Sequence, residues 1–220
     1  MYHHIAVPPP DADAIRQDLS VTPDNFEAQL RYLQAQGYQS ISLYDLVDYL
    51  NRGRLLPPKP VVLTFDDGYR DAYTNAFPLL QKYGMTGTFF LVTAPIDQHN
   101  PEYLSWEQVK EMNAAGMDME CHTYTHPDLR GKDADYIIWQ VVGSKEAIEQ
   151  RTRRPVRFFA YPSGRYDDLV VQILRSAHFW GAVTTMYGDT HSSEETFALR
   201  RVRVHGGYSL DEFVAVLHGQ

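Results

Sequence analysis

Apolar residues along the chain follow two patterns, a helical spacing and short unbroken runs. After Thr22 and Pro23, which can cap and open a helix, Phe26, Leu30 and Leu33 recur every three or four residues. The unbroken run at 61–65 is instead typical of a buried strand. These patterns predict helices at 23–36, 46–53, 70–83, 106–115, 133–151, 168–178 and from 210, and strands at 40–43, 61–65, 86–92, 117–121, 156–161 and 180–184.

The alternation of strands and helices favours a parallel sheet covered by helices, either open or closed as a barrel. Capping boxes at 105–108 and 209–212 mark the starts of two helices. Pro78 should kink or restart the helix predicted at 70–83. No repeat or linker interrupts the chain, so its 220 residues predict a single α/β domain over residues 1–220.

Charge and composition narrow the classes of function. The net charge of −8 and the lack of a basic run argue against nucleic acid or an anionic membrane surface as a partner. No apolar stretch reaches the length of a transmembrane segment, no signal peptide is visible, and a lone Cys121 cannot form an internal disulfide. The abrupt opening at Met1 leads us to expect trimming from a longer, exported precursor. No pattern in the sequence predicts an oligomeric state.

Two adjacent carboxylates, Asp66 and Asp67, end the strand predicted at 61–65 and precede Gly68. Ionised carboxylates are rarely buried unless they are paired or bind a metal. The carboxyl ends of strands are also where α/β proteins place their chemistry. The alternative is a polar turn, for which Asp-Gly is a common sequence. The Asp66-Asp67 pair by itself does not distinguish a functional site from a polar turn.

Two histidines, His122 and His126, follow the strand predicted at 117–121 and lie four residues apart. This spacing occurs in metal sites, although two unrelated surface histidines would also produce it. The carboxyl ends of parallel strands share one rim, which would bring these histidines to Asp66 and Asp67. Two imidazoles and one carboxylate suit a divalent metal, and they leave the second carboxylate free to act as a base.

Three segments together resemble a known family. Segments 64–68 (Thr-Phe-Asp-Asp-Gly), 122–126 (His-Thr-Tyr-Thr-His) and 159–164 (Phe-Ala-Tyr-Pro-Ser-Gly) follow one another as in polysaccharide deacetylases of carbohydrate esterase family 4, the NodB-homology domain. Segments 1–5 and 26–38 are similar to the circularly permuted branch that deacetylates poly-β-1,6-N-acetylglucosamine. The resemblance implies a distorted, incomplete (β/α) barrel.

The resemblance implies a role for each residue of these motifs. Asp67, His122 and His126 would bind the metal, and Asp66 would be the general base that activates the attacking water. The backbone N–H of Ser163 would stabilise the oxyanion. This ligand set leads us to expect Zn²⁺, with Co²⁺, Ni²⁺ or Fe²⁺ as alternatives.

The resemblance also implies that His3 is the general acid that protonates the leaving amine. His3 would then have to be charged while Asp66 is still ionised, which predicts a bell-shaped pH profile. His205 is the alternative acid, because it follows a strand of alternating apolar residues. His4 is expected to be structural or to face solvent.

Neighbours of the motif residues carry separate expectations. Ala160 stands where typical members of the family have an arginine that orients the base, and Arg201 is the candidate replacement. The alternative is that the basic cluster around Arg201 is an exposed edge strand. Glu120 is expected to be either a partner of the ligand His122 or a surface carboxylate. Cys121 is expected to be a small buried residue.

Five further residues are candidates for substrate binding. Pro162 and Gly164 flank the oxyanion turn, where proline fixes φ and glycine allows a close backbone approach. Tyr161 would form a groove wall or belong to the core. Trp106 would line a sugar subsite or anchor its helix, and Tyr69 would border the cleft or pack at its helix start.

These expectations predict a metal-dependent hydrolase that removes N-acetyl groups from N-acetylglucosamine units of a polysaccharide. Poly-β-1,6-N-acetylglucosamine, chitin and peptidoglycan are the substrates considered. An acetylxylan O-acetyl esterase is the alternative enzyme, and a non-catalytic carbohydrate-binding domain of the same fold is the alternative of another class. Such glycans lie outside the cytoplasm, so we expect an extracellular or cell-envelope location.

Overall fold

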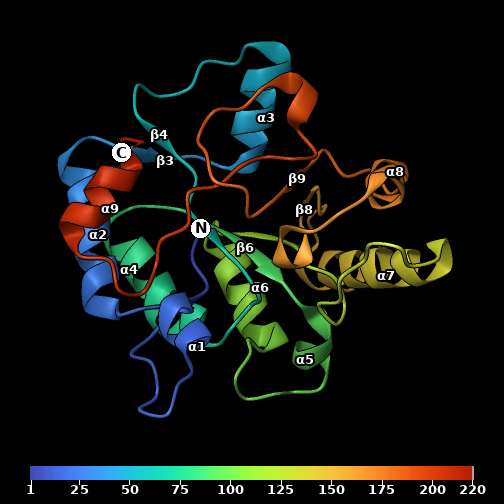
Figure 1. The fold of residues 1–220 in the computed structure, drawn as a ribbon, viewed down its shortest axis with the longest axis horizontal. Coiled ribbons are helices and arrows are strands. Elements are labelled where there is room, and N and C mark those ends of the chain that lie inside the picture. The colour runs from blue at the N-terminus through green and yellow to red at the C-terminus, as the bar shows by residue number, and fades with distance from the viewer. Residues whose placement is uncertain (220) are drawn as a thin grey trace.

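A curled sheet of five parallel strands forms the centre of the molecule (Figure 1). In the computed structural model, which describes residues 1–219, neighbouring strands in this sheet are also successive in the chain. This order is expected of repeated βα units. The strands are β5 (Thr64–Phe65), β6 (Thr88–Leu91), β7 (Asp118–Cys121), β8 (Phe158–Ala160) and β9 (Gly181–Val183).

Segments near the two ends of the chain extend this sheet into a distorted barrel. Tyr2 forms a parallel bridge with Phe65 on one side, and Leu199 forms one with Val183 on the other. The two added segments also meet, because the N–H of Val204 donates to the carbonyl of the first residue at 3.1 Å. In Figure 1 the N-terminus accordingly lies at the centre of the molecule. The expected fold class, a distorted and incomplete (β/α) barrel in a single domain, is confirmed.

Helices surround the sheet, and four short strands form two small parallel sheets beside it. The helices are α1 (Ala14–Leu19), α2 (Pro23–Ala35), α3 (Leu43–Arg52), α4 (Phe77–Lys82), α5 (Thr93–Asp97), α6 (Trp106–Ala114), α7 (Ala134–Thr152), α8 (Asp168–Ser176) and α9 (Leu210–Leu217). Short 3₁₀ turns span Pro162–Gly164 and Ser193–Glu195. The small sheets pair β1 (His4–Ile5) with β2 (Ser20–Val21) and β3 (Gln39–Ser40) with β4 (Pro60–Val61).

Helix caps explain why several predicted helices begin where they do. The hydroxyls of Thr22, Ser105 and Ser209 each accept a hydrogen bond from the backbone N–H three residues later. Both predicted capping boxes are therefore present. The predicted restart at Pro78 is also confirmed: a π-helical segment, Ala72–Ala76, ends there and α4 begins, with the proline in its first turn.

Two strand predictions were wrong. The segment predicted as a strand at 40–43 contains Ser42, which forms a capping box with Asp45 and starts α3. The run at 61–65 is split between β4 and β5, which belong to different sheets. An unbroken apolar run records burial but not which neighbour each half pairs with, so the break was invisible in the pattern.

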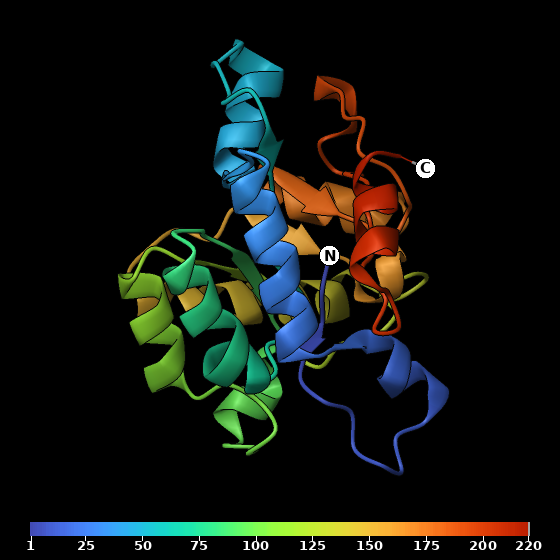
Figure 2. The same cartoon turned by 90° about the vertical axis from the view of Figure 1, so that its left-hand side faces the viewer.

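The core fills the space between the sheet and the helices. The rings of Tyr2, Phe65 and Phe89 form a stack, with centroid separations of 5.4 and 4.6 Å. Figure 2 shows α2 running beside the N-terminal segment, with α9 packed next to it. Within residues 1–219, no helix combines the length and apolar character needed to span a bilayer.

Candidate metal centre and active site

The turn after β5 gives the two adjacent carboxylates different surroundings. Asp67 and Gly68 have φ values of 74° and 78°, in the left-handed region. A Cβ added at Gly68 would also lie 3.1 Å from Leu91 Cδ2 on β6, so the position favours glycine for two reasons. The side chains of Asp66 and Asp67 therefore contact different partners: Asp66 pairs with Arg201, and Asp67 faces the two histidines.

Asp67, His122 and His126 converge on one point. One ligand atom from each lies within 4.8 Å of the others. Asp67 Oδ1 is 3.3 Å from His122 Nε2 and 3.5 Å from His126 Nε2. The histidines are brought together by a tight loop after β7, in which the His126 N–H donates to Thr123 Oγ1 at 2.9 Å. The fold thus brings together Asp67 and the two histidines, which lie 55 or more residues apart in the sequence.

A backbone carbonyl sets the tautomer of His122. Its Nδ1 lies 2.7 Å from the Ala160 carbonyl oxygen, which can only accept, so Nδ1 carries the proton. Nε2 then presents its lone pair towards Asp67, as a metal ligand requires. Sequence reasoning did not find this contribution of Ala160, and no signal could have shown it, because every residue has a carbonyl.

This donor set fits a divalent metal. Two imidazole nitrogens and one carboxylate oxygen leave coordination positions for water and substrate. Burial acts to raise the pKa of the Asp67 carboxyl, but the hydrogen bond and charge of a protonated His122 outweigh it and hold the pKa below its usual value. The same contacts raise the pKa of His122, so a cation bound here would displace the proton on His122 Nε2. Burial lowers the pKa of His126, which favours the neutral, ligating form.

Arg201 holds Asp66 through a bidentate ion pair. Its Nη1 and Nη2 donate to Asp66 Oδ1 and Oδ2, each at 2.7 Å. The same guanidinium donates to the Thr184 carbonyl and to Thr64 Oγ1. Arg201 is only 7% exposed, which excludes the alternative of an exposed edge strand. Arg201, from a distant segment, thus contacts the carboxylate for which Ala160 has no side chain to offer.

The ion pair controls the charge of Asp66. Burial would raise the pKa of this carboxyl, but the charge and hydrogen bonds of Arg201 hold it well below its usual range. Asp66 is therefore ionised at neutral pH.

His3 lies near the two carboxylates because Tyr2, the residue before it, forms a parallel bridge with Phe65 of β5. The Asp66 N–H donates to the Tyr2 carbonyl at 3.0 Å, which places His3 at the same rim. Burial lowers the pKa of His3 to about 4; the charges of Asp66 and Asp67 act in the opposite direction and do not cancel it. This shift is contrary to the expectation of an imidazolium that is already charged at neutral pH.

The other two histidines considered for this role have separate partners. His4 is buried, with Nδ1 2.6 Å from Asp71 Oδ2 and its ring stacked on Tyr69 at 3.6 Å, so it is structural and does not face solvent. His205 Nδ1 lies 2.7 Å from Asp18 Oδ1. The structure brings His3, and not these two, against the carboxylate pair.

The turn at 162–164 is rigid. Ser163 is exposed and has a φ of 55°. Pro162 is buried, and a Cβ added at Gly164 would lie 2.2 Å from Thr185 Oγ1. The glycine is therefore required by the close approach of Thr185, in keeping with the conformational roles expected of Pro162 and Gly164, and their contact with a substrate stays a prediction.

Tyr161 and Trp106 are core residues and do not contact a groove. Tyr161 is 1% exposed and its hydroxyl donates to the Phe197 carbonyl at 2.9 Å. Trp106 is buried at the start of α6 and its Nε1 donates to Asp97 Oδ1 at 2.9 Å. Of the two alternatives stated for each, the structure supports the core for Tyr161 and the helix anchor for Trp106, and their burial argues against substrate contact.

Tyr69 does border the site. Burial and the neighbouring Asp67 carboxylate raise the pKa of its hydroxyl, so the phenol stays protonated and can donate. Its ring is half-buried between His4 and Tyr103, at centroid distances of 3.6 and 5.1 Å.

Glu120 has neither of the expected roles. It is buried, and it accepts hydrogen bonds from the backbone N–H groups of Arg157 and Phe158 and from the Tyr44 hydroxyl. Burial raises its pKa to about 8. Its carboxyl group accepts from the backbone N–H groups at the start of β8 and so fixes the backbone there. Cys121 is buried, as expected.

Sequence reasoning missed Gln140, which holds the loop between the two ligand histidines. This side chain is fully buried in α7, and its Oε1 accepts from the N–H groups of Tyr124 and Thr125 at 3.1 and 2.9 Å. Its Nε2 donates to Thr125 Oγ1 at 2.7 Å. A glutamine among the apolar positions of a helix was the available signal.

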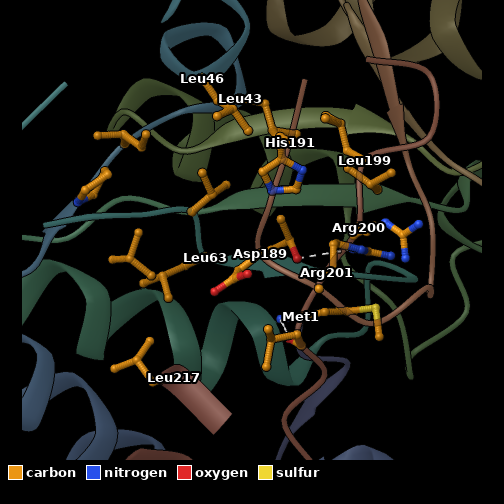
Figure 3. Close-up of a pocket in the computed structure, with 18 of the residues that line it drawn as sticks. Met1, Leu43, Leu46, Leu63, Asp189, His191, Leu199, Arg200, Arg201 and Leu217 are labelled. Carbon is orange, nitrogen blue, oxygen red and sulfur yellow. Dashed lines mark hydrogen bonds between the residues drawn. The ribbon is translucent and has the colours of Figure 1, made fainter. Parts of the chain in front are cut away.

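An apolar cavity of about 250 Å³ adjoins this site on the side of Arg201 (Figure 3). Leu43 and Leu63 line it, with Asp189 and His191 near one another on its wall. Arg201 takes part in its lining, but the three ligand candidates do not.

Comparison with known proteins adds independent information. The sequence model of the family described as polysaccharide deacetylase matches residues 54–181. YxkH of Bacillus subtilis, whose name assigns it provisionally to that family, is 31% identical over 99% of this chain and 74% of its own length. The poly-β-1,6-N-acetyl-D-glucosamine N-deacetylase of Staphylococcus epidermidis is 30% identical over 72% of this chain; the match spans 59% of that relative.

Two solved structures are similar over nearly the whole chain. The Streptococcus pyogenes deacetylase PplD, in complex with acetate, has a TM-score of 0.92 and 32% identity, and covers 98% of this chain and 95% of its own. IcaB from Ammonifex degensii has a TM-score of 0.84 and 25% identity, and covers 99% and 93%. The family match at 54–181 contains the carboxylate pair and the histidine pair, whereas His3 and Arg201 lie outside it.

Proposed function

The chain belongs to the polysaccharide deacetylase family, and we propose that it hydrolyses the N-acetyl groups of N-acetylglucosamine units in a polysaccharide with the help of a bound divalent metal. The family supports a hydrolase with deacetylase activity. One observation carries the finer proposal: a carboxylate fixed by a buried arginine, Asp66, stands directly beside the convergent set Asp67, His122 and His126.

Asp67, His122 and His126 would hold the metal. When bound there, a divalent cation would lower the pKa of a water molecule and polarise the acetamide carbonyl. The Ala160 carbonyl keeps His122 in the ligating tautomer, and the Gln140 side chain keeps the loop of His126 in place. We propose Zn²⁺, because two imidazoles and a carboxylate suit it.

Asp66 takes the proton of the attacking water. Arg201 keeps this carboxylate ionised and aims it through two parallel hydrogen bonds. The same bonds make the protonated form of Asp66 short-lived, because protonation weakens its pairing with Arg201. The proton is therefore passed on readily to a neighbouring base.

His3 stands next to Asp66 and completes this path. Because its pKa is lowered to about 4, it is neutral before substrate binds at neutral pH. The proton that His3 donates to the amine must then come from the attacking water by way of Asp66. This replaces the expectation of an imidazolium that is charged in advance.

The turn at Ser163 would supply a hydrogen-bond donor to the oxyanion. Its φ of 55° exposes the residue at the tip of a turn that Pro162 and Gly164 make rigid. The backbone N–H of Ser163 would donate to the oxyanion, and a rigid donor needs no reorganisation when the charge develops.

The substrate class is supported by the names of similar proteins. A poly-β-1,6-N-acetyl-D-glucosamine N-deacetylase is among the relatives, and IcaB is among the similar structures. We therefore propose a β-1,6-linked N-acetylglucosamine polymer as the first substrate to test, and an extracellular or cell-envelope location.

Acetate release tests the proposal. The assay compares poly-β-1,6-N-acetylglucosamine, chitin oligomers, peptidoglycan and acetylxylan, with the metal content of the protein measured in parallel. Release from a glucosamine-based glycan is expected. Release from acetylxylan alone would establish the esterase alternative. A metal-loaded protein that releases acetate from none of them would refute the proposal.

A further inference from the structure

Three aromatic side chains lie together on the surface next to the loop that carries the ligand histidines. Trp139, on α7, is 51% exposed. Its ring lies 5.2 Å from that of Tyr124 and 5.8 Å from that of Tyr136. Tyr124 stands between His122 and His126 in the chain, so this group, here called the aromatic platform (Tyr124, Tyr136 and Trp139), is connected to the candidate metal centre through the loop that carries both ligands.

The platform is held in one arrangement by a buried side chain. Gln140 accepts from the Tyr124 N–H at 3.1 Å and donates to the Tyr136 hydroxyl at 3.3 Å. Asp133 accepts from the Tyr136 N–H at 2.8 Å and so caps α7 on which two of the rings lie. An ordered aromatic surface loses little side-chain entropy when a ligand binds it, which makes it suitable for recognition.

Trp139 and its neighbour Ile138 are both exposed on α7, and Trp139 is the larger and the more exposed of the two. Burying an indole is worth about 1.5–3 kcal/mol, so leaving one half exposed forgoes part of that stabilisation. In Figure 1, α7 extends from the centre of the molecule to its edge, next to α5. A polymer bound at the metal centre has further sugar units that must cross the adjoining surface.

We propose that the aromatic platform is a subsite that stacks on a sugar ring of the glycan beyond the unit whose acetyl group reacts. This inference rests on the proposed function. The C–H faces of a β-linked hexosamine are apolar and match an indole, while its hydroxyls can reach the phenols and Thr125. One lysine and two aspartates at 132–135 give a local net charge of −1, which suits a neutral or partly deacetylated, cationic chain.

The test uses N-acetylglucosamine oligomers in β-1,6 linkage, from the disaccharide to the hexasaccharide. For the wild type, kcat/KM should rise with chain length. Trp139→Leu should lower kcat/KM by about 2- to 10-fold for the hexasaccharide, through KM, and leave the disaccharide unchanged. Trp139→Phe should restore most of the loss, because it keeps an aromatic face. Trp180→Leu is the matched control, since Trp180 is 41% exposed but packs against Tyr44.

Several outcomes would overturn the inference. These are an unchanged length dependence in Trp139→Leu, an equal loss in Trp180→Leu, or no rescue by phenylalanine. A self-association of the wild type that Trp139→Leu abolishes would assign the platform to a second copy of the chain.

A second readout separates this inference from the proposed function. Calorimetric titration of the hexasaccharide into Asp66→Asn, with and without Trp139→Leu, measures binding without turnover. Weaker binding in the double variant supports the platform even if the wild type releases no acetate. Equal binding refutes it even if the enzyme is active.

Discussion

The buried pair of Asp66 and Arg201 offers the sharpest test of the site. Both side chains are almost fully buried, and two hydrogen bonds of 2.7 Å join them. Replacing Arg201 by Met keeps the volume and removes the charge, which leaves an uncompensated carboxylate in the interior. Removing one partner of such a pair costs about 3–5 kcal/mol of unfolding free energy.

A double-mutant cycle isolates the pair. Asp66→Asn and Arg201→Met should each destabilise strongly, but the double variant buries no unpaired charge. Its loss should therefore fall short of the sum of the single losses by about 2–3 kcal/mol. The measurement is urea unfolding at neutral pH with a chelator present, so that no bound metal contributes. Additivity within about 0.5 kcal/mol would refute the assignment of Arg201 as the partner of Asp66.

The pH dependence of the stability of the Arg201→Met variant gives a second test of the pair, because the direction of the change follows from the pKa of Asp66. In the wild type the pKa of Asp66 is depressed below its ordinary 3.8, so the pair stabilises the protein above that pH and is lost only as the pH falls through the lower, folded value. Without Arg201, burial raises the pKa of Asp66. The deficit of the variant should then be largest at neutral pH and shrink towards about pH 4, where the buried carboxyl is neutral. A deficit that grows on acidification would contradict this account.

Further predictions concern turnover, metal binding, pH and the sheet. Asp66→Asn should lower kcat by about 10²- to 10⁴-fold while leaving the metal content unchanged; lost metal would mean that Asp66 is a ligand. His122→Ala and His126→Ala should each lose the metal, measured by elemental analysis after dialysis, and retention in both would refute the ligand set. The depressed pKa of His3, about 4, makes the folded protein bind its proton less readily than the unfolded chain, so the metal-free wild type should lose stability between about pH 6.5 and 4. His3→Gln should flatten this slope, and an unchanged slope would contradict the burial of His3. Glu120→Ala should destabilise the protein by about 1–3 kcal/mol in urea unfolding, because the backbone N–H groups of Arg157 and Phe158 would lose their buried acceptor, and a neutral effect would contradict the acceptor role.

Local chemistry explains what could be predicted. Thr22, Ser105 and Ser209 cap helices through contacts only three residues long, so their effect is visible in the sequence. The adjacent Asp66 and Asp67 at a strand end were likewise visible, because burial makes such charges costly without partners. These signals were sufficient for a parallel α/β domain and a candidate metal site, whereas the incomplete barrel and the separate roles of Asp66 and Asp67 were implied by the family resemblance.

Residues of the same type occupy different environments in the structure, because tertiary packing decides which groups surround them. Tyr161 and Tyr69 were both candidates for the cleft, yet one is buried in the core and the other borders Asp67. Glu120 precedes the ligand His122 by two residues and serves β8 instead. Aromatic and acidic residues fit a core, a cleft or a hydrogen-bond network equally well, and their sequence neighbours do not distinguish these.

The sequence by itself determined that two carboxylates and two histidines end strands of a parallel α/β domain, since strand ends, caps and spacing depend on nearby residues. Only the tertiary structure decided which groups control them. Arg201 reaches Asp66 across 135 residues, and the Ala160 carbonyl reaches His122 across 38. Such pairs depend on how the strands are ordered and how the ends of the chain close the barrel. Hydrophobic periodicity records that a residue is buried, but not which distant group it is buried against.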